Sequence, residues 1–300
     1  MMLDRFSRRM LDFSKQGVKM RKILAALLLV TALVLVSCAT EANPWGLNGV
    51  WEAEDEYEKY IFSFTADGYY AYECYYDDIL GYVSFGTYEA DDAHIYTDDA
   101  DYDYFWDGNN LILEFLDDMV FVRKSRTARN NTSPAKLKGV WGSDFGLAGF
   151  SANGTFVTMG YYATMDDYTA EGDVFKIGEN EYPYLIINSK LYIEDDYDLF
   201  GGSYKLVFER KTSDGKDQTS KEILTLNNPW HLTDMSDGDD HYVYTFNSNG
   251  RYKLEYYNDY NTDEWTSEGK YNYSGHKIEL SEDGNLAYVI IDLRPFMFSI

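Results

Sequence analysis

Positively charged side chains are scarce in this chain of 300 residues. Lysine and arginine number 26 against 51 aspartate and glutamate, which gives a formal net charge of −25 at pH 7. Phosphate binding depends on clustered Lys and Arg that release counterions, so we expect no nucleic acid among the partners. The apolar content of 45%, with 17% aromatic residues, is nevertheless too high for a disordered acidic chain. The sequence therefore predicts a folded core.

Residues that usually carry catalysis are also rare. The four histidines are scattered, and the sequence contains no Gly-x-Ser-x-Gly elbow, His-Glu-x-x-His pair, phosphate loop or dinucleotide fingerprint. Cys74 lies in an alternating, strand-like segment with acidic neighbours, which favours an inert buried thiol over a nucleophile. We predict a protein that is not an enzyme, with no catalytic residues, no cofactor and no dedicated metal site.

No apolar run is long enough for a transmembrane helix. The longest, Ile23–Val36, has 14 residues, whereas a helix needs about 20 to cross the hydrocarbon core. Residues 1–37 hold seven Lys or Arg against two Asp, so the rest of the chain carries 19 basic and 49 acidic residues. A basic start followed by a short apolar run is typical of a secretory signal peptide. We assign 1–37 to a signal peptide with an extended basic region.

The end of this run carries a second motif, Leu35-Val36-Ser37-Cys38. It resembles the bacterial lipobox, which implies a diacylglycerol thioether on Cys38, cleavage before it, and attachment to a membrane through the lipid. Residues 38–44 then form a lipidated tether, and Cys74 has no partner for a disulfide. Ala39, where Asp would retain a lipoprotein at the inner membrane, implies the outer membrane of the cell envelope. The alternative is an ordinary secretory signal with a chance cysteine.

The exported part contains three copies of one unit. A Leu-x-Gly-x-Trp sequence at Leu47–Trp51 recurs at Leu137–Trp141 and, altered, at Leu226–Trp230. Each Trp is followed by an Asp-Gly or Asn-Gly pair between aromatic residues, which is a strong hairpin signal. These pairs are Asp67-Gly68, Asn153-Gly154 and Asn249-Gly250. A third element aligns on Gly86, Gly172 and Gly269, each of which is expected to open a further strand.

Alternation with a period of two dominates all three copies, and no long apolar helical stripe is present. The fold class predicted is all-β, with three tandem antiparallel meanders of about six strands. The copies are placed at residues 45–124, 136–211 and 226–300, separated by polar joints. The shared motifs resemble the small lipocalin-like domains of bacterial lipoproteins. Because each copy is less than half as long as a full lipocalin, small and partly open barrels without a deep ligand cavity are expected.

Surface aromatic residues provide the candidate ligand contacts. The recurring Trp51, Trp141 and Trp230 are predicted to fill the barrel cores, whereas Trp106 and Trp265 do not recur and are free to act at a surface. We expect a lipid-anchored binding or structural module. One alternative is a surface lipoprotein that binds a glycan or a protein through exposed Tyr and Trp. Another is a glycoside hydrolase with two facing carboxylates.

Acidic loops are the remaining candidates for a site. Asp195–Asp198 and Asp237–Asp240 contain closely spaced carboxylates of the kind that calcium prefers. Solvated loops are the simpler interpretation, and calcium binding is the alternative.

Overall fold

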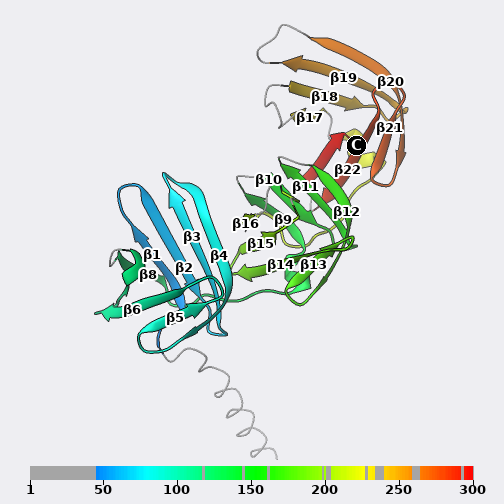
Figure 1. Cartoon of the computed structure of the whole chain (residues 1–300). Coiled ribbons are helices and arrows are strands. Elements are labelled where there is room, and N and C mark those ends of the chain that lie inside the picture. The colour runs from blue at the N-terminus through cyan, green and yellow to red at the C-terminus, as the bar shows by residue number, and fades with distance from the viewer. Residues whose placement is uncertain are drawn as a thin grey trace, which may run out of the picture.

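The computed structural model describes residues 45–116, 119–143, 146–160, 163–197, 199–200, 204–226, 229–233, 240–258, 264–291 and 294–299. The predicted signal peptide, Cys38 and the tether lie outside these residues. The described chain is all-β and forms three barrel-like units in tandem, which confirms the predicted fold class (Figure 1). None of its helices in the described part is both long and apolar enough to cross a membrane.

Unit 1 is a closed antiparallel barrel of eight strands, in which β8 pairs with β1. Its elements are β1 (Gly49–Glu54), β2 (Glu58–Phe64), β3 (Tyr69–Tyr76), β4 (Ile79–Ala90), β5 (His94–Thr97), β6 (Asp101–Asp107), β7 (Asn110–Leu113), the 3-10 turn η1 (Glu114–Leu116) and β8 (Met119–Ser125).

Unit 2 repeats this closed barrel, with β16 paired to β9. Its elements are α2 (Pro134–Leu137), β9 (Gly139–Ser143), β10 (Gly146–Phe150), β11 (Thr155–Gly160), β12 (Thr164–Glu171), β13 (Val174–Ile177), β14 (Asn180–Ile187), β15 (Lys190–Asp195) and β16 (Tyr204–Arg210).

Unit 3 is a curled sheet of seven strands. Its elements are α3 (Lys221–Leu226), β17 (Trp230–Thr233), β18 (Asp240–Phe246), β19 (Arg251–Asn258), β20 (Trp265–Ser274), β21 (Lys277–Leu280), β22 (Asn285–Ile291) and β23 (Arg294–Ser299). The prediction of partly open barrels with about six strands is wrong for units 1 and 2. Strands of only four residues, such as β5 and β13, joined by tight turns, let eight strands fit in each unit.

The hairpin predictions are confirmed at all three positions. Gly68, Gly154 and Gly250 have φ of +87°, +94° and +82°, a conformation that L side chains rarely adopt. In each unit the carbonyl of this glycine accepts the backbone N–H of a tyrosine, and that tyrosine's hydroxyl reaches back to the start of the turn. These tyrosines are Tyr88, Tyr168 and Tyr271.

This tyrosine corrects the alignment of the third element. Tyr168 occupies the position of Tyr88, so the counterpart of Gly86 is Asp166 and not Gly172. Gly172 instead lies in the turn between β12 and β13, with φ of +61°. Glycine gave the wrong alignment because it occurs both in turns and at the start of strands. The hydrogen bond from the tyrosine hydroxyl to the start of the hairpin turn occurs at the same position in all three units.

The three recurring tryptophans fill the cores, as predicted. Trp51 and Trp141 are fully buried and Trp230 nearly so. Each indole N–H donates to a leucine carbonyl just before the first strand, at 2.6 Å to Leu47, 2.7 Å to Leu137 and 2.8 Å to Leu224. Stacked and edge-to-face aromatic rings occupy the rest of each interior, as for Phe62 against Tyr72 with centroids 4.4 Å apart. The barrels are packed with their own side chains.

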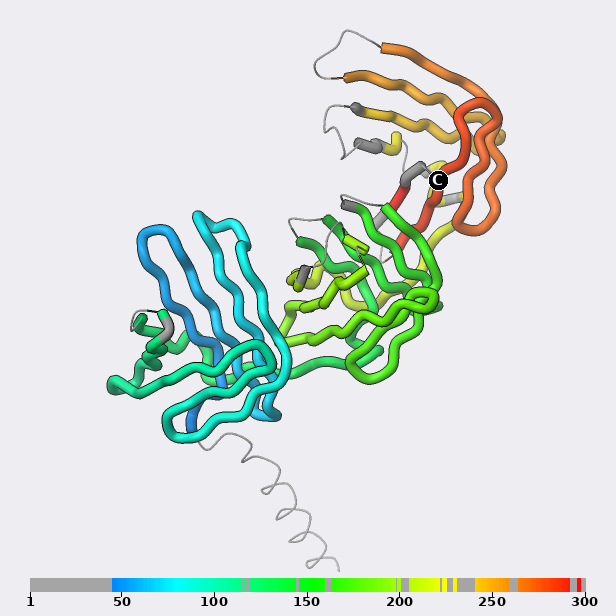
Figure 2. Tube along the Cα trace, viewed as in Figure 1, coloured from blue at the N-terminus to red at the C-terminus, as the bar shows by residue number. Residues whose placement is uncertain are grey.

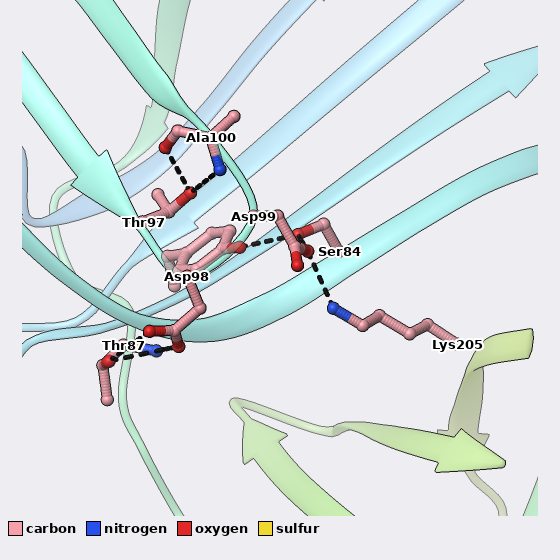
Figure 3. A network of polar contacts seen from close by, with 8 residues as sticks. Ser84, Thr87, Thr97, Asp98, Asp99, Ala100 and Lys205 are labelled. Carbon is pink, nitrogen blue, oxygen red and sulfur yellow. Dashed lines mark hydrogen bonds and ion pairs between the residues drawn. The ribbon is translucent and has the colours of Figure 1, made fainter. Parts of the chain in front are cut away.

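Units 1 and 2 are docked through an apolar interface. The outer faces of β1, β3 and β4 in unit 1 pack on the outer faces of β14, β15 and β16 in unit 2. The buried residues of this interface are Ala71, Val83, Phe85, Ala128, Leu185, Ile187, Tyr192 and Val207. At its edge Lys205 of unit 2 donates to Asp99 of unit 1 at 2.7 Å, beside Ser84 (Figure 3).

Units 2 and 3 are also docked through an apolar interface, with early strands of the first unit against late strands of the second. The first strands of unit 2 pack on β22 and β23 of unit 3, through Val140, Val157, Ala287, Val289, Ile291 and Phe296. Val140 occupies the position of Val50, which packs against the first interface. Gly149 allows the close approach, since a Cβ there would meet Ile291 and Phe296 at 2.9 and 3.0 Å. In both interfaces, early strands of one unit therefore dock on late strands of the next unit. The units follow one another in a curved row (Figure 2).

The two ends of this row differ in polarity. In unit 3 the face that would dock a further unit carries Lys253 and Glu255, where unit 2 has Val157 and Met159. In unit 1 the opposite face leaves Phe105 and Val120 exposed, at the positions of the docked Leu185 and Val207. Of thirteen exposed large hydrophobic side chains among the described residues, ten belong to unit 1: Trp45, Tyr57, Tyr76, Ile79, Tyr82, Tyr96, Phe105, Trp106, Val120 and Val122.

Candidate functional site

The candidate site is an open pocket at one mouth of the unit 1 barrel, with a volume of about 540 Å³. The segment just before β1, the hairpin between β6 and β7, and the end of β8 surround it. Its lining residues are Trp45, Gly46, Trp106, Gly108, Asn109, Arg123, Lys124, Ser125 and Arg126. The pocket thus combines two tryptophans and three cationic side chains in a strongly acidic protein. We call it the unit 1 pocket.

The closure of the barrel assembles this pocket. Pairing of Trp51 with Arg123 between β1 and β8 places the guanidinium 4.1 Å from the centre of the Trp51 ring. Trp106, from the end of β6, also packs against Trp51, with ring centroids 5.4 Å apart. Trp106 nevertheless stays 38% exposed, as does Trp45. The buried Trp51 ring therefore supports Arg123 and Trp106, which both line the pocket.

Arg123 is held by the barrel, whereas its cationic neighbours Lys124 and Arg126 are exposed. Its guanidinium donates to the carbonyl of Gly46, and its Nε is buried without a hydrogen-bond partner. Burial, with Arg126 nearby, lowers the pKa of Arg123 below its ordinary value. Lys124 lies 3.5 Å from Glu52, a carboxylate that Lys59 also contacts at 3.2 Å. Arg126 is exposed and makes no ion pair with any described residue.

Comparison with unit 2 separates structural from functional features. Arg210 lies 3.9 Å from the Trp141 ring and donates to the carbonyl of Lys138 at 3.1 Å. The Arg over Trp arrangement is thus a shared element of the closed barrels. Trp106, in contrast, has Ile186 as its counterpart. The second indole is specific to unit 1, in agreement with its lack of recurrence in the sequence.

The two predicted surface tryptophans are not brought together. Trp106 lies in unit 1 and Trp265 begins β20 in unit 3, at the other end of the row (Figure 1). Trp265 is 44% exposed and stacks on Tyr256, with ring centroids 5.3 Å apart. The sequence indicated neither Trp45 nor the cationic residues as members of the Trp106 site. The only available signal was the basic joint that begins at Lys124 in an acidic chain.

A second polar cluster lies inside the interface between units 1 and 2. Glu73 of β3 is buried and accepts hydrogen bonds from Lys190 at 2.6 Å and from the hydroxyl of Tyr192 at 2.7 Å. Burial raises the pKa of Tyr192 well above its ordinary value, and Glu73 contributes to the shift. The cluster aligns the two units, because a buried carboxylate requires all of its partners.

We expect Lys190→Met to lower the free energy of unfolding by about 3 kcal/mol, because the substitution leaves Glu73 buried without a cation. Urea unfolding at pH 7 measures the loss. Lys176→Met is the matched control, since Lys176 pairs with Glu181 on an exposed hairpin of the same unit and such pairs contribute under about 1 kcal/mol. Equal effects of the two substitutions would contradict the role of Glu73 in docking.

Asp91 and Asp99 are not suited to act as general acids. Hydrogen bonds from the backbone N–H of Ala93 lower the pKa of Asp91 to about 2, with further contributions from His94 and Tyr96. Burial acts to raise the pKa of Asp99, but Lys205 and Ser84 together hold it below its ordinary value. A general acid for glycoside hydrolysis needs a raised pKa, so neither group fits that role.

The acidic loops have structural partners where they are described. Asp195 is buried and accepts the backbone N–H of Leu199 at 2.9 Å and of Phe200 at 2.8 Å. Asp198 and residues 237–239 lie outside the described residues. Within the described ranges no group of three or more His, Cys, Asp or Glu is arranged to hold a metal ion. Cys74 is buried, as predicted, and burial raises the pKa of its thiol.

Comparisons with known proteins add little to this description. No family model and no curated protein matches the chain. Among solved structures, a putative 6-phosphogluconolactonase from Bacteroides uniformis ATCC 8492 matches with 11% sequence identity over 83% of this chain and 87% of that chain, at a TM-score of 0.14. A TM-score this low carries no argument about fold or activity.

Proposed function

We propose that the protein is a lipid-anchored lipoprotein of the bacterial cell envelope, whose three lipocalin-like units form a non-catalytic binding or structural module. The lipid is a diacylglycerol on Cys38, and Ala39 favours the outer membrane. The observation that supports the module most strongly is the repeated docking of the units. Two interfaces formed by corresponding parts of the units hold them in one row. The orientation of unit 1 relative to units 2 and 3 is therefore fixed.

The packed interiors support binding at a surface over binding in a cavity. Tyr and Phe rings fill the barrels around Trp51 and Trp141, whose side chains are fully buried. A lipocalin that carries a small molecule needs an open lumen instead. The exposed apolar side chains and the unit 1 pocket are the surfaces that remain for a ligand.

Metabolic labelling tests the anchor. Cells that express the chain are grown with radiolabelled palmitate, and we expect the label in the wild-type protein and none in Cys38→Ala, because the thioether requires the Cys38 sulfur. Cys74→Ala is the matched control and should retain the label, since the Cys74 thiol is buried in unit 1. Label that persists in Cys38→Ala would contradict the lipid anchor.

Glycan binding is the second candidate, and the pair of exposed indoles in the unit 1 pocket favours it. Aromatic rings next to polar groups are common in sugar sites, and Asn109 lies on the same rim. The separation of Trp106 from Trp265 argues against one shared glycan surface along the row. A glycan array discriminates the two functions, because binding lost in Trp106→Ala and kept in Trp265→Ala would favour the glycan site.

A further inference from the structure

We propose that the unit 1 pocket binds the phosphate groups of anionic lipid headgroups, so that unit 1 lies on the bilayer surface to which the chain is tethered. The occupant is the membrane itself, recognised by two indoles and a cluster of cations. This inference goes beyond the lipid anchor, because it assigns a second and non-covalent membrane contact and fixes which end of the row faces the lipid.

The charge of this region is opposite to the net charge of residues 38–300. Residues 119–138 contain six Lys or Arg and no Asp or Glu, and three of the six line the pocket. Lys124 and Arg126 are exposed there, and Glu52 is the carboxylate in ion-pair contact with Lys124. A Lys or Arg near an anionic membrane strengthens binding about fivefold. Acidic groups that lie more than about 10 Å from the pocket are largely screened at 0.1 M salt.

The aromatic residues suit the same partner. Trp45 and Trp106 each keep part of the indole exposed at the pocket rim. Tryptophan prefers the level of the headgroups in a bilayer, since the ring is largely apolar while its N–H is polar. Phe105 and Val122 are exposed on the outer face of the same barrel, and Val122 lies two residues from Lys124 on the same side of β8. A surface of cations with exposed apolar side chains beside them is typical of proteins that lie at a membrane interface.

The tether places this pocket close to the bilayer. From Cys38 to Trp45 the chain advances by seven residues, which spans at most about 25 Å when fully extended. This step rests on the proposed lipid at Cys38, whereas the pocket itself does not. Unit 3, with Lys253 and Glu255 on its terminal face, is then the end directed away from the lipid.

Vesicle sedimentation tests the proposal. The segment Ala39–Ile300, which has no lipid and retains every residue of the three cores, is mixed with vesicles of phosphatidylcholine alone or with 30% phosphatidylglycerol. We expect binding to the anionic vesicles only, weaker at higher salt. Lys124→Glu with Arg126→Glu should weaken it by at least about 25-fold, since loss of each cation weakens binding about fivefold. Trp45→Ala alone should also weaken binding to the anionic vesicles, without a change in the melting temperature of the protein.

The matched control is Arg251→Glu with Lys270→Glu, a second exposed cationic pair that faces across β19 and β20 in unit 3. It makes the same change in charge and should leave vesicle binding within twofold. An equal loss in both double variants, or equal binding to uncharged vesicles, would overturn the proposal. Full competition by millimolar inorganic phosphate would also overturn it, since a soluble phosphate compound would then be the ligand. Because the segment has no lipid, failure here is separate from failure of palmitate labelling.

Discussion

Trp141→Ala is expected to lower the free energy of unfolding by about 4 kcal/mol, the typical cost of truncating a buried tryptophan. The indole is fully buried in the middle unit and donates to the carbonyl of Leu137 at 2.7 Å. Its loss leaves a cavity and also removes the ring that supports the guanidinium of Arg210. Since unit 2 docks on both neighbours, the loss should affect the whole row. Urea unfolding followed by circular dichroism measures the effect.

Trp265→Ala is the control for this substitution. Its indole is exposed in unit 3 and contacts Tyr256 through one face only. We expect a change below about 1 kcal/mol, as for most surface substitutions that remove a single contact. Similar losses of unfolding free energy in the two variants would contradict the role of Trp141 as a core residue of unit 2.

The second large effect is expected at alkaline pH. Burial is the main cause that raises the pKa of five core tyrosines to about 12, namely Tyr102, Tyr104, Tyr168, Tyr244 and Tyr252. A folded-state pKa above the unfolded value of about 10 gives stability that is complete below pH 10 and is lost as the pH rises toward 12. At pH 11, these five pKa shifts together should lower the free energy of unfolding by about 7 kcal/mol relative to neutral pH. This loss is comparable to the whole stability of many domains.

Absorbance at 295 nm and near-ultraviolet circular dichroism, recorded on the same samples from pH 8 to 12.5, test this prediction. The tyrosinate signal of the buried rings should appear together with the loss of tertiary structure, near pH 11. A complete rise in absorbance while the dichroism is unchanged would mean that the rings ionise in the folded protein, and would contradict their burial.

Local sequence signals predicted the elements that depend on neighbouring residues. The Asp-Gly and Asn-Gly pairs gave the correct hairpins, because the turn requires a positive φ that Gly68 and its counterparts supply. The recurring Trp51, Trp141 and Trp230 were correctly assigned to the cores. The number of strands was underestimated, because four-residue strands such as β5 carry too few alternations to be recognised.

Contacts between distant residues could not be predicted in this way. Trp51 and Arg123 meet only when β8 closes on β1, and the pocket exists only after that closure. The docking faces consist of outward apolar residues such as Val50 and Val140, which look like ordinary strand alternation in the sequence. Their recurrence ahead of the core tryptophans was visible, but nothing local shows that the following unit covers them.

Mass spectrometry of the amino-terminal peptide from the mature protein tests the lipid anchor most directly. We expect a chain that begins at Cys38, with the mass of a diacylglyceryl group on its sulfur. An unmodified Cys38, or a mature chain that begins at any other residue, would contradict the lipid anchor and with it the proposed orientation of the three units.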